Sequence, residues 1–245
     1  HLDHGIRTES GADARFVEGL ARHYNVSFVS VQLHLGSHAS EELARQKRWE
    51  FLRHVKDEYQ ADAILTAHHD DDVVETIIMN LMRGTGWRGL VSLIETADIK
   101  RPLLGMRKAD ILGYAHEHKL TWREDTTNAD ENYRRNFVRR QIMPKVSDEQ
   151  FARFLRLYDS QKKLRQTIEA EVANLNTGDR YQFIMWPDAV AYEYLRRLIG
   201  SLPRPELSRA LLFIRTARAN REMPLSNGVK LRTDASKLIV IRGED

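Results

Sequence analysis

The chain has 245 residues, of which 42% are hydrophobic and 30% charged, a balance typical of a globular protein with one large domain or two modest ones. It contains no cysteine, which excludes disulfides, zinc–thiolate sites, iron–sulfur clusters and thiol catalysis within these residues. No apolar run reaches the length of a membrane span and no signal peptide is visible, so we expect a cytoplasmic protein without a membrane partner.

The first half of the chain alternates short apolar runs with amphipathic segments. The apolar runs predict strands at 1–3, 26–35 and 61–67. The segments between and after them predict helices at 12–24, 40–59 and from about 70 to 82. This alternation implies parallel strands joined by right-handed crossovers. The predicted fold class is therefore α/β, with a parallel sheet flanked by helices.

Turn-forming residues separate the elements that follow. After the third helix comes Arg83-Gly84-Thr85-Gly86, where Gly84 suits the position after a helix C-cap and the two glycines would also let backbone approach a ligand. The range 99–104 contains Arg-Pro, so we expect an edge or terminal strand segment there. A helix is expected at 108–118, a polar turn at 124–128, and a helix from 133 that ends at Pro144.

The composition changes after Pro144, and we expect a domain boundary near residue 146. The first domain would be 1–146, and 147–245 would form a smaller, mostly helical domain that ends in a β-hairpin. In the second domain the pattern predicts a long amphipathic helix at 148–175, a strand at 178–184 and helices at 187–200 and 206–220. A Ser-Asn-Gly turn signal at 226–228 precedes a hairpin expected at 229–241.

The range 66–76, which reads TAHHDDDVVET, joins a predicted buried strand to a predicted helix. One of its three adjacent aspartates can be explained as an N-cap and a second by the helix dipole, but a third beside two histidines is more charge than capping requires. Such a cluster suits a divalent cation with oxygen ligands, such as Mg²⁺ carrying phosphate. The structural alternative is that Asp70 or Asp71 caps the helix and Glu75 completes a capping box.

Basic residues concentrate later in the chain, although the formal net charge is only +3. The range 133–145 carries five basic residues and no acid, and more follow up to Arg165. This pattern predicts a surface that meets phosphates, the alternative being a solvated face on two helices. Tyr133 or Phe137 could stack on bases, although core packing is the more common role of such residues.

Several motifs together resemble the tRNA(Ile)-lysidine synthetases, a family of the PP-loop (N-type) ATP pyrophosphatase superfamily. The resemblance spans nearly all of the first 146 residues. Its motifs, in chain order, are HLDHGIR at 1–7, ARQKRW at 44–49, AHHDDDVVET at 67–76 with Val73 replacing the family's usual Gln, RGTG at 83–86, RPLL at 101–104, EDTTN at 124–128, and Arg135-Asn136 with Arg139 and Pro144.

The resemblance implies a two-step reaction on the wobble cytidine of tRNA(Ile) with a CAU anticodon. ATP would adenylate the C2 oxygen of the base and release pyrophosphate, and the ε-amine of L-lysine would then displace AMP. It also implies Mg²⁺ as a cofactor and tRNA as the partner, and a homodimer is possible.

The resemblance also implies roles for individual residues. Those expected to be catalytic are His68, Asp72, Glu75, Arg48 and Arg139; those expected to bind the nucleotide are Asp3, His4, Gly5, Arg83, Gly84 and Gly86. Substrate contacts are expected from Asp71, Asn128, Tyr133, Arg135, Asn136 and Arg140, and metal contacts from Asp71 and Asp72. His68 would bond a phosphate or assist proton transfer. Asp72 and Glu75, with Asp71, would hold Mg²⁺ or orient the lysine ammonium.

One part of the family pattern has no counterpart here. The family's S-G-G-x-D-S phosphate loop, whose amides would cradle pyrophosphate, belongs before the segment that starts at His1. We expect that the sequence is a fragment, or that a portion before His1 carries the loop, and that these residues are not catalytically complete by themselves.

Three alternatives stay open. The first is another PP-loop enzyme, a tRNA 2-thiolation enzyme or an amidating synthetase, although the absence of cysteine disfavours cysteine-dependent thiolation. The second is a non-catalytic RNA-binding module. The third is a metal-dependent phosphohydrolase, whose ligands would be Asp3, His4, His68, His69 and Asp70 to Asp72.

Overall fold

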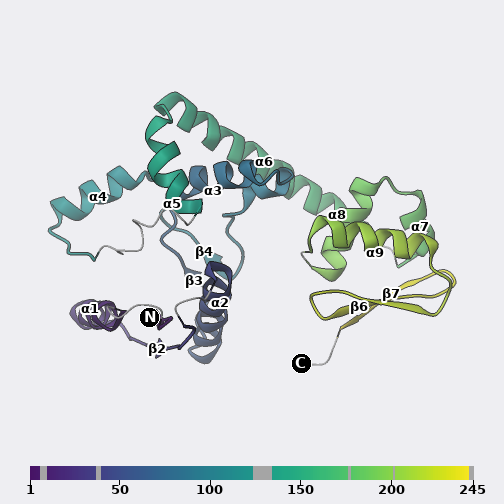
Figure 1. The fold of residues 1–245 in the computed structure, drawn as a ribbon, viewed down its shortest axis with the longest axis horizontal. Helices are drawn as coiled ribbons and strands as arrows, with labels where there is room; N and C mark the ends of the chain where they lie inside the picture. The colour runs from purple at the N-terminus through teal and green to yellow at the C-terminus, as the bar shows by residue number, and fades with distance from the viewer. Residues whose placement is uncertain (6–9, 37–39, 124–133, 176–177, 201, 243–245) are drawn as a thin grey trace. The chain divides into compact units, whose positions relative to one another are not determined.

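The computed structural model describes residues 1–5, 10–36, 40–123, 134–175, 178–200 and 202–242. The chain forms two compact units, His1–Tyr158 and Asp159–Asp245. The long helix α6 (Asp148–Asn174) belongs to both, since it crosses the division. Figure 1 traces the element order through the two units.

Two pairs of short parallel strands lie in the first unit. β1 (Leu2–Asp3) pairs with β2 (Val31–Gln32), and β3 (Ile64–Leu65) pairs with β4 (Ile99–Lys100). The helices α1 (Ser10–His23) and α2 (Glu41–Glu58) follow β1 and β2 in the chain. These strand–helix–strand connections confirm the predicted α/β class with parallel strands.

The capping of α2 follows from its sequence. Ser40 is the N-cap, and its hydroxyl accepts a hydrogen bond from the Leu43 N–H at 3.2 Å. This bond satisfies one of the backbone donors that the first turn leaves without a helical partner. The expected strand at 26–35 is shorter than predicted: regular strand structure is limited to Val31 and Gln32, although the Leu33 and Leu35 N–H groups also donate to the carbonyl oxygens of Asp3 and His4.

The helix α3 (Asp70–Met82) is the buried centre of the first unit. Val73 and Ile77 pack with Val91 and Tyr158, while the next residues in the chain, Val74 and Ile78, pack on another side with Val138 and Phe151. Val73, Val74, Ile77 and Ile78 are each at most 8% exposed, which fits the apolar spacing of the sequence. Leu81 and Met82, at the C-terminal end of the helix, are exposed.

Three of the elements after α3 contact it. The 3₁₀ helix η1 (Trp87–Val91) contacts α3, and β4 follows. Then come α4 (Lys108–Glu117), α5 (Arg134–Phe137), a π-helix η3 (Val138–Ile142) and a 3₁₀ turn η4 (Met143–Lys145). Figure 1 shows α5 beside α3, at the ends of β3 and β4, and both α5 and η3 contact α3. Asp70 and the residues near it therefore lie where a strand ends and several helices meet.

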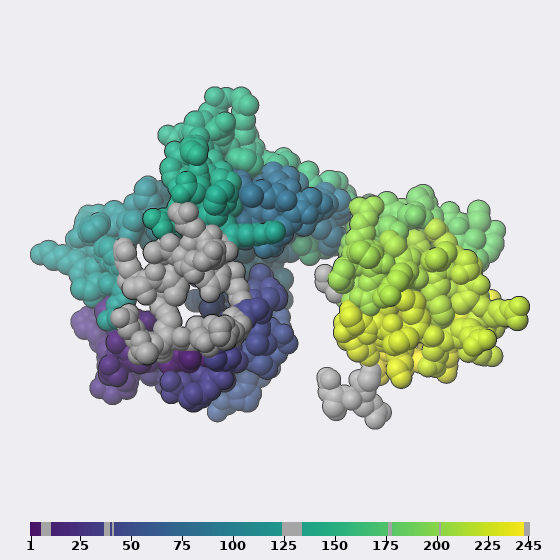
Figure 2. Space-filling view, in the orientation of Figure 1, coloured from purple at the N-terminus to yellow at the C-terminus, as the bar shows by residue number. Residues whose placement is uncertain are grey.

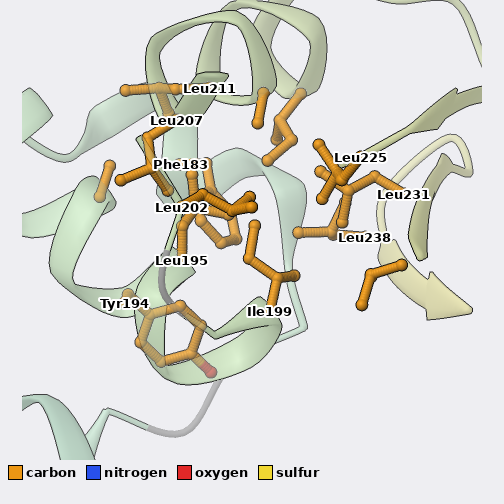
Figure 3. Packing of buried hydrophobic residues seen from close by; sticks show 14 of the residues in the cluster. Phe183, Tyr194, Leu195, Ile199, Leu202, Leu207, Leu211, Leu225, Leu231 and Leu238 are labelled. Carbon is orange, nitrogen blue, oxygen red and sulfur yellow. The ribbon is translucent and has the colours of Figure 1, made fainter. Parts of the chain in front are cut away.

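The second unit has its own core. It contains α7 (Arg180–Met185), α8 (Asp188–Ile199), α9 (Arg204–Thr216) and an antiparallel sheet of β5 (Arg221–Pro224), β6 (Val229–Thr233) and β7 (Leu238–Arg242). Phe183, Leu195, Leu207 and Leu231 are fully buried between the helices and the sheet (Figure 3). In the space-filling view, the green and yellow atoms of this unit form one continuous packed body (Figure 2).

One expectation for the second unit was wrong and another is confirmed. The predicted strand at 178–184 is the helix α7, because Asp179 is an N-cap that accepts from the Tyr181 N–H at 2.8 Å and the helix then turns Phe183 into the core. The hairpin predicted at 229–241 is confirmed, since β6 pairs with β7, and β5 adds a third strand that pairs with β6 across the Ser-Asn-Gly turn. Among the helices of the described ranges, none combines the length and hydropathy needed to cross a bilayer.

Candidate functional site

The site is built around the junction between β3 and α3. The N-cap of α3 is His69, and its backbone N–H donates to Asp72 Oδ2 at 3.1 Å. The capping box thus runs from His69 to Asp72, and the structural alternative of a cap at Asp70 or Asp71 closed by Glu75 was wrong. Asp72 can reach back to the cap because a side chain at the third helical position lies over the first turn.

The first two aspartates of α3 bind backbone amides of the segment that leads into α4. Asp70 Oδ1 accepts from the Gly105 N–H at 2.9 Å, and Asp71 Oδ2 accepts from the Lys108 N–H at 2.8 Å. Lys108 is the first residue of α4, so Asp71 satisfies one of the donors that the start of α4 leaves open. These two carboxylates therefore join α3 to α4.

The two remaining acids of α3 bind two arginines. Arg135 donates from Nη2 to Asp72 Oδ1 at 2.7 Å and from Nε to Glu75 Oε2 at 3.0 Å. Arg139 donates to both oxygens of Glu75, from Nε at 2.7 Å and from Nη2 at 2.9 Å. We call these four residues the acid–arginine quartet. Its formal charges cancel, and its bidentate pair has the geometry that makes such hydrogen bonds strong.

The acid of the quartet that binds both arginines is buried, whereas the arginines are partly exposed. The side chain of Glu75 is 3% exposed, whereas Arg139 is 29% exposed and Arg135 31%. The hydrogen bonds that Arg139 donates to Glu75 raise the pKa of Arg139, because a buried carboxylate favours the charged guanidinium. The two arginines lie four residues apart on α5 and the π-helix η3, so both face α3. The acids thus hold two guanidinium groups whose outer edges reach the surface.

A second cluster lies at the adjacent strand ends. Arg101, immediately after β4, donates from Nη1 to Thr66 Oγ1 and to His68 Nδ1, both at 2.7 Å. Thr66 Oγ1 lies 2.9 Å from the same ring nitrogen. Because β3 and β4 are parallel, their carboxyl ends meet at one edge, which brings these residues together. Burial first, and then the nearby Arg101 cation, lower the pKa of His68 below its usual value of 6.5.

The predicted nucleotide residues near the N-terminus have structural partners. Asp3 is buried at the end of β1, and its Oδ1 accepts from the Gly5 N–H at 2.8 Å. Gly5 has φ of 65°, and a Cβ there would lie 2.1 Å from the Leu33 carbonyl oxygen, so only glycine fits this turn. His4 lies in the same turn. Whether this turn also contacts nucleotide stays a prediction.

The other predicted residues lie elsewhere. Arg83 is the C-cap of α3, and Gly84 follows it with φ of 66°, which confirms Gly84 as the residue after the C-cap. Gly86 lies two residues further along the same exposed loop. Arg48 lies exposed on α2, Asn136 is buried and Arg140 is exposed. Phe137 is 40% exposed, so the expectation of core packing was wrong. Asn128 and Tyr133 fall outside the described residues.

The predicted basic surface is partly neutralised. Besides the two arginines of the quartet, Arg153 pairs with Glu149 and Arg165 with Glu169 along α6. Among the described residues, no group of three or more histidine, aspartate or glutamate side chains could hold a metal ion by itself. The Mg²⁺ contacts expected from the aspartates of α3 stay a prediction.

Sequence reasoning missed the role of two residues in this region. Arg101 and Thr66 were interpreted only as parts of motifs. Thr66 directly follows β3 and Arg101 directly follows β4, and these two strands are parallel. An arginine immediately after one strand and a histidine immediately after its neighbour is a signal that could have placed both at the same sheet edge.

The sequence pattern of the PP-loop domain matches residues 1–146, more than half of the chain. The chain belongs to the PP-loop family. Among curated relatives, the tRNA(Ile)-lysidine synthase of Nitrosomonas europaea is 32% identical over 94% of this chain and 50% of its own length. The enzyme of Thermus thermophilus is 31% identical over 98% of this chain and 51% of its own length. The enzyme of Methylococcus capsulatus is 37% identical over 60% of this chain and 35% of its own length.

This PP-loop chain thus spans about half the length, or less, of the curated relatives it matches. Among solved structures, it is similar to the U34-tRNA thiolase NcsA from Methanococcus maripaludis, determined with its [4Fe-4S] cluster. The TM-score is 0.55 at 16% identity, over 66% of this chain and 59% of the thiolase chain. At this identity the likeness shows the PP-loop fold alone.

Proposed function

We propose that this chain is part of a tRNA(Ile)-lysidine synthase, a ligase that joins lysine to the wobble cytidine of tRNA(Ile) with a CAU anticodon. The observation that carries the proposal is the similarity to curated tRNA(Ile)-lysidine synthases, which covers 94% and 98% of this chain and so includes both units. The arrangement of acids, arginines and His68 at one strand-to-helix junction supports it, because this edge is where α/β folds bind ligands.

The proposed reaction has two steps. The C2 oxygen of the cytosine attacks the α-phosphorus of ATP, and the bond to pyrophosphate breaks. The ε-amine of lysine, which must be deprotonated, then attacks C2, and the bond from C2 to the oxygen of AMP breaks. Both steps need alignment and charge neutralisation more than covalent chemistry by the protein.

In this proposal the described residues bind and orient the reactants. Arg139, held by Glu75, would present its outer N–H groups to phosphate or to the developing charge, with Arg48 in the same role. His68 would bond a phosphate oxygen. Asp72 and Glu75 would set the arginines, and the lysine ammonium would approach the same carboxylates. Contacts with tRNA would come from Arg135, Asn136, Arg140 and the segment 128–133.

The donor set permits a limited role for Mg²⁺, which would neutralise phosphate charge when bound. Both oxygens of Asp72 already accept hydrogen bonds, from Arg135 and from the His69 N–H, so Asp72 fits a metal ion poorly. Asp71 fits better, because among the described residues the one hydrogen bond to its side chain comes from the Lys108 N–H to Oδ2. Mg²⁺ bound mainly by nucleotide phosphates and water needs only one or two carboxylates.

The remaining parts of the proposal concern organisation. Residues 1–146 would form the catalytic domain, and 147–245 a mostly helical accessory domain that grips tRNA. We expect the protein in the cytoplasm, where its substrates are, and we expect a homodimer that sedimentation equilibrium would detect.

The test uses the protein as its gene encodes it, with labelled lysine and a tRNA(Ile) transcript bearing CAU. We expect incorporation only with ATP and Mg²⁺, and none into a transcript with uridine at the wobble position. Asp72→Asn should lower the rate at least about 10²-fold, as loss of a positioned charged group does. Asp62→Asn, an exposed acid before β3 at the opposite end of the strand from His68, is the matched control and should leave the rate unchanged.

Absence of lysine transfer by a folded protein that binds the transcript would refute the proposal. Sulfur incorporation into the same tRNA would instead favour the thiolation alternative. That alternative has little chemical support in these residues, because no cysteine among them could ligate an iron–sulfur cluster.

A further inference from the structure

The geometry around His68 carries an inference about how this side chain works. A guanidinium group has only N–H donors and no acceptor. Arg101 Nη1 lies 2.7 Å from His68 Nδ1, a hydrogen-bond distance, so Nδ1 must be the acceptor. A proton on Nδ1 would point at the proton of the guanidinium. The ring proton therefore lies on Nε2, and His68 is neutral.

Thr66 supports the same assignment. Its hydroxyl accepts from Arg101 at 2.7 Å, and its own proton is then available for His68 Nδ1 at 2.9 Å. Both neighbours thus offer hydrogens to one nitrogen. An imidazolium ring, which donates from both nitrogens, would lose both of these bonds and face a cation.

Arg101 is itself held in place. It is 6% exposed, its backbone N–H donates to Glu95 Oε1 at 2.8 Å, and its Nε lies 3.4 Å from the Ile94 carbonyl oxygen. A buried guanidinium with several fixed contacts has one orientation, so it can impose an orientation on His68. Such a partner behind a histidine commonly fixes which ring nitrogen is available for function.

We propose that Arg101 is the positioning residue of His68: it fixes the imidazole as the neutral Nε2–H tautomer, so that Nε2 donates a hydrogen bond to an anionic oxygen of the substrate. This deepens the proposed function and rests on it for the identity of that oxygen, which would belong to a phosphate. It also decides between the two roles expected for His68, since a ring whose Nδ1 is occupied by a cation is a donor and not a base.

The first experiment is independent of activity. In the protein labelled with ¹⁵N at histidine, NMR correlation spectra distinguish protonated from unprotonated ring nitrogens, and a His68→Gln variant assigns the signal among the ten histidines. At pH about 7 we expect Nε2 protonated and Nδ1 unprotonated, as their hydrogen bonds require. A ring protonated at Nδ1, or doubly protonated, would overturn the proposal whatever the protein catalyses.

Variants then test the role of Arg101. Arg101→Met should produce a mixture of tautomers at His68 and raise its pKa, because the cation and donor at Nδ1 are removed. Arg53→Met, the same substitution at an exposed arginine of α2, is the matched control and should leave the His68 spectrum unchanged. If Arg101→Met fails to fold, Thr66→Val keeps the arginine donor and should retain the Nε2–H tautomer. Loss of that tautomer in a folded Thr66→Val protein would assign the positioning to Thr66 and overturn the role of Arg101.

Measurements of lysine transfer distinguish a failure of the tautomer proposal from a failure of the proposed function. Arg101→Met should lower kcat for lysine transfer about 10–100-fold, the usual effect of removing such a supporting partner, with KM for lysine nearly unchanged. An unchanged tautomer together with a lower stability would show a merely structural arginine and refute positioning. A wild-type protein with the expected tautomer but no lysine transfer would refute the proposed function and leave the tautomer assignment standing.

Discussion

Arg139→Lys is the most informative perturbation of the acid–arginine quartet. The substitution keeps the positive charge but replaces two N–H donors, at 2.7 and 2.9 Å from the Glu75 oxygens, by one ammonium that cannot match both. A hydrogen bond to a charged group contributes about 1.5–3 kcal/mol. Because one of the two bonds is lost and Arg135 still binds Glu75, we expect a loss of about 2 kcal/mol from the free energy of unfolding of the first unit.

A larger substitution at Arg139 tests the same estimate of how much its contact with Glu75 stabilises the first unit. Arg139→Met removes the charge and leaves the buried Glu75 with Arg135 alone. Breaking a buried ion pair from one side costs about 3–5 kcal/mol, and the remaining arginine places this case at the lower end. Arg134→Lys, an exposed neighbour on α5, is the matched control, and its effect should stay within about 0.5 kcal/mol.

Urea unfolding monitored by tryptophan fluorescence measures these changes if the signal comes from one unit. A Trp186→Phe background removes the tryptophan of the second unit, and the other three lie in the first: Trp49, Trp87 and Trp122. With an m-value of about 2 kcal/mol/M, a loss of about 2 kcal/mol lowers the midpoint by about 1 M. Equal midpoints for Arg139→Lys and Arg134→Lys, at equal m-values, would refute the bidentate contact.

Three further changes test other parts of the structure. Gly89→Ala should lower the stability of the first unit by about 1–3 kcal/mol in the same assay, because its Cβ would lie 2.2 Å from Thr85 Oγ1; failure of Thr85→Gly to restore the midpoint would contradict the clash. Since the folded pKa of His68 lies below 6.5, the unfolded state takes up this proton first, so the stability due to His68 is complete above pH about 6.5 and declines below it. The urea midpoint should therefore fall less steeply below pH 6.5 in His68→Asn, and equal slopes would count against the depressed pKa. Ser226→Ala should raise the pKa of Glu206, which is lowered by hydrogen bonds from Ser226, so the stability that Glu206 contributes above its usual pKa of 4.5 should shrink; carboxyl NMR titration measures this, and an unchanged pKa would refute it.

The strand-to-helix junction was predictable because its signals are local. The apolar spacing after Asp70 defined α3, the serine at 40 defined the start of α2, and the glycine at 84 defined the end of α3. Each of these signals depends on residues within one or two helical turns. Local chemistry also shows where such reading fails: the cap at Asp179 was present in the sequence, but the apolar residues after it were interpreted as a strand.

The partners of the charged residues were not predictable in the same way. Glu75 and Arg139 lie 64 residues apart, and Thr66 and Arg101 lie 35 apart. Spacing within a helix cannot show which distant segment will pack against it. The run of basic residues at 133–145 therefore predicted a surface for phosphate, whereas two of its arginines bind the acids of α3. The fold thus gives some basic residues of one run acidic partners within the protein and leaves others for partners outside it.

The division of charge changes what the acidic sequence of α3 implies. Of its four acids, Asp70 and Asp71 accept from backbone amides, while Asp72 and Glu75 are balanced by two arginines. The same junction also holds the outer N–H groups of the two arginines and, by the tautomer proposed above, the Nε2–H donor of His68, and these donors favour anions. A lysine ammonium that binds Asp72 or Glu75 must therefore compete with a guanidinium already there, whereas a phosphate need not. Under the proposed function we therefore expect nucleotide phosphate to bind before lysine, an order that agrees with the proposed adenylation before lysine transfer.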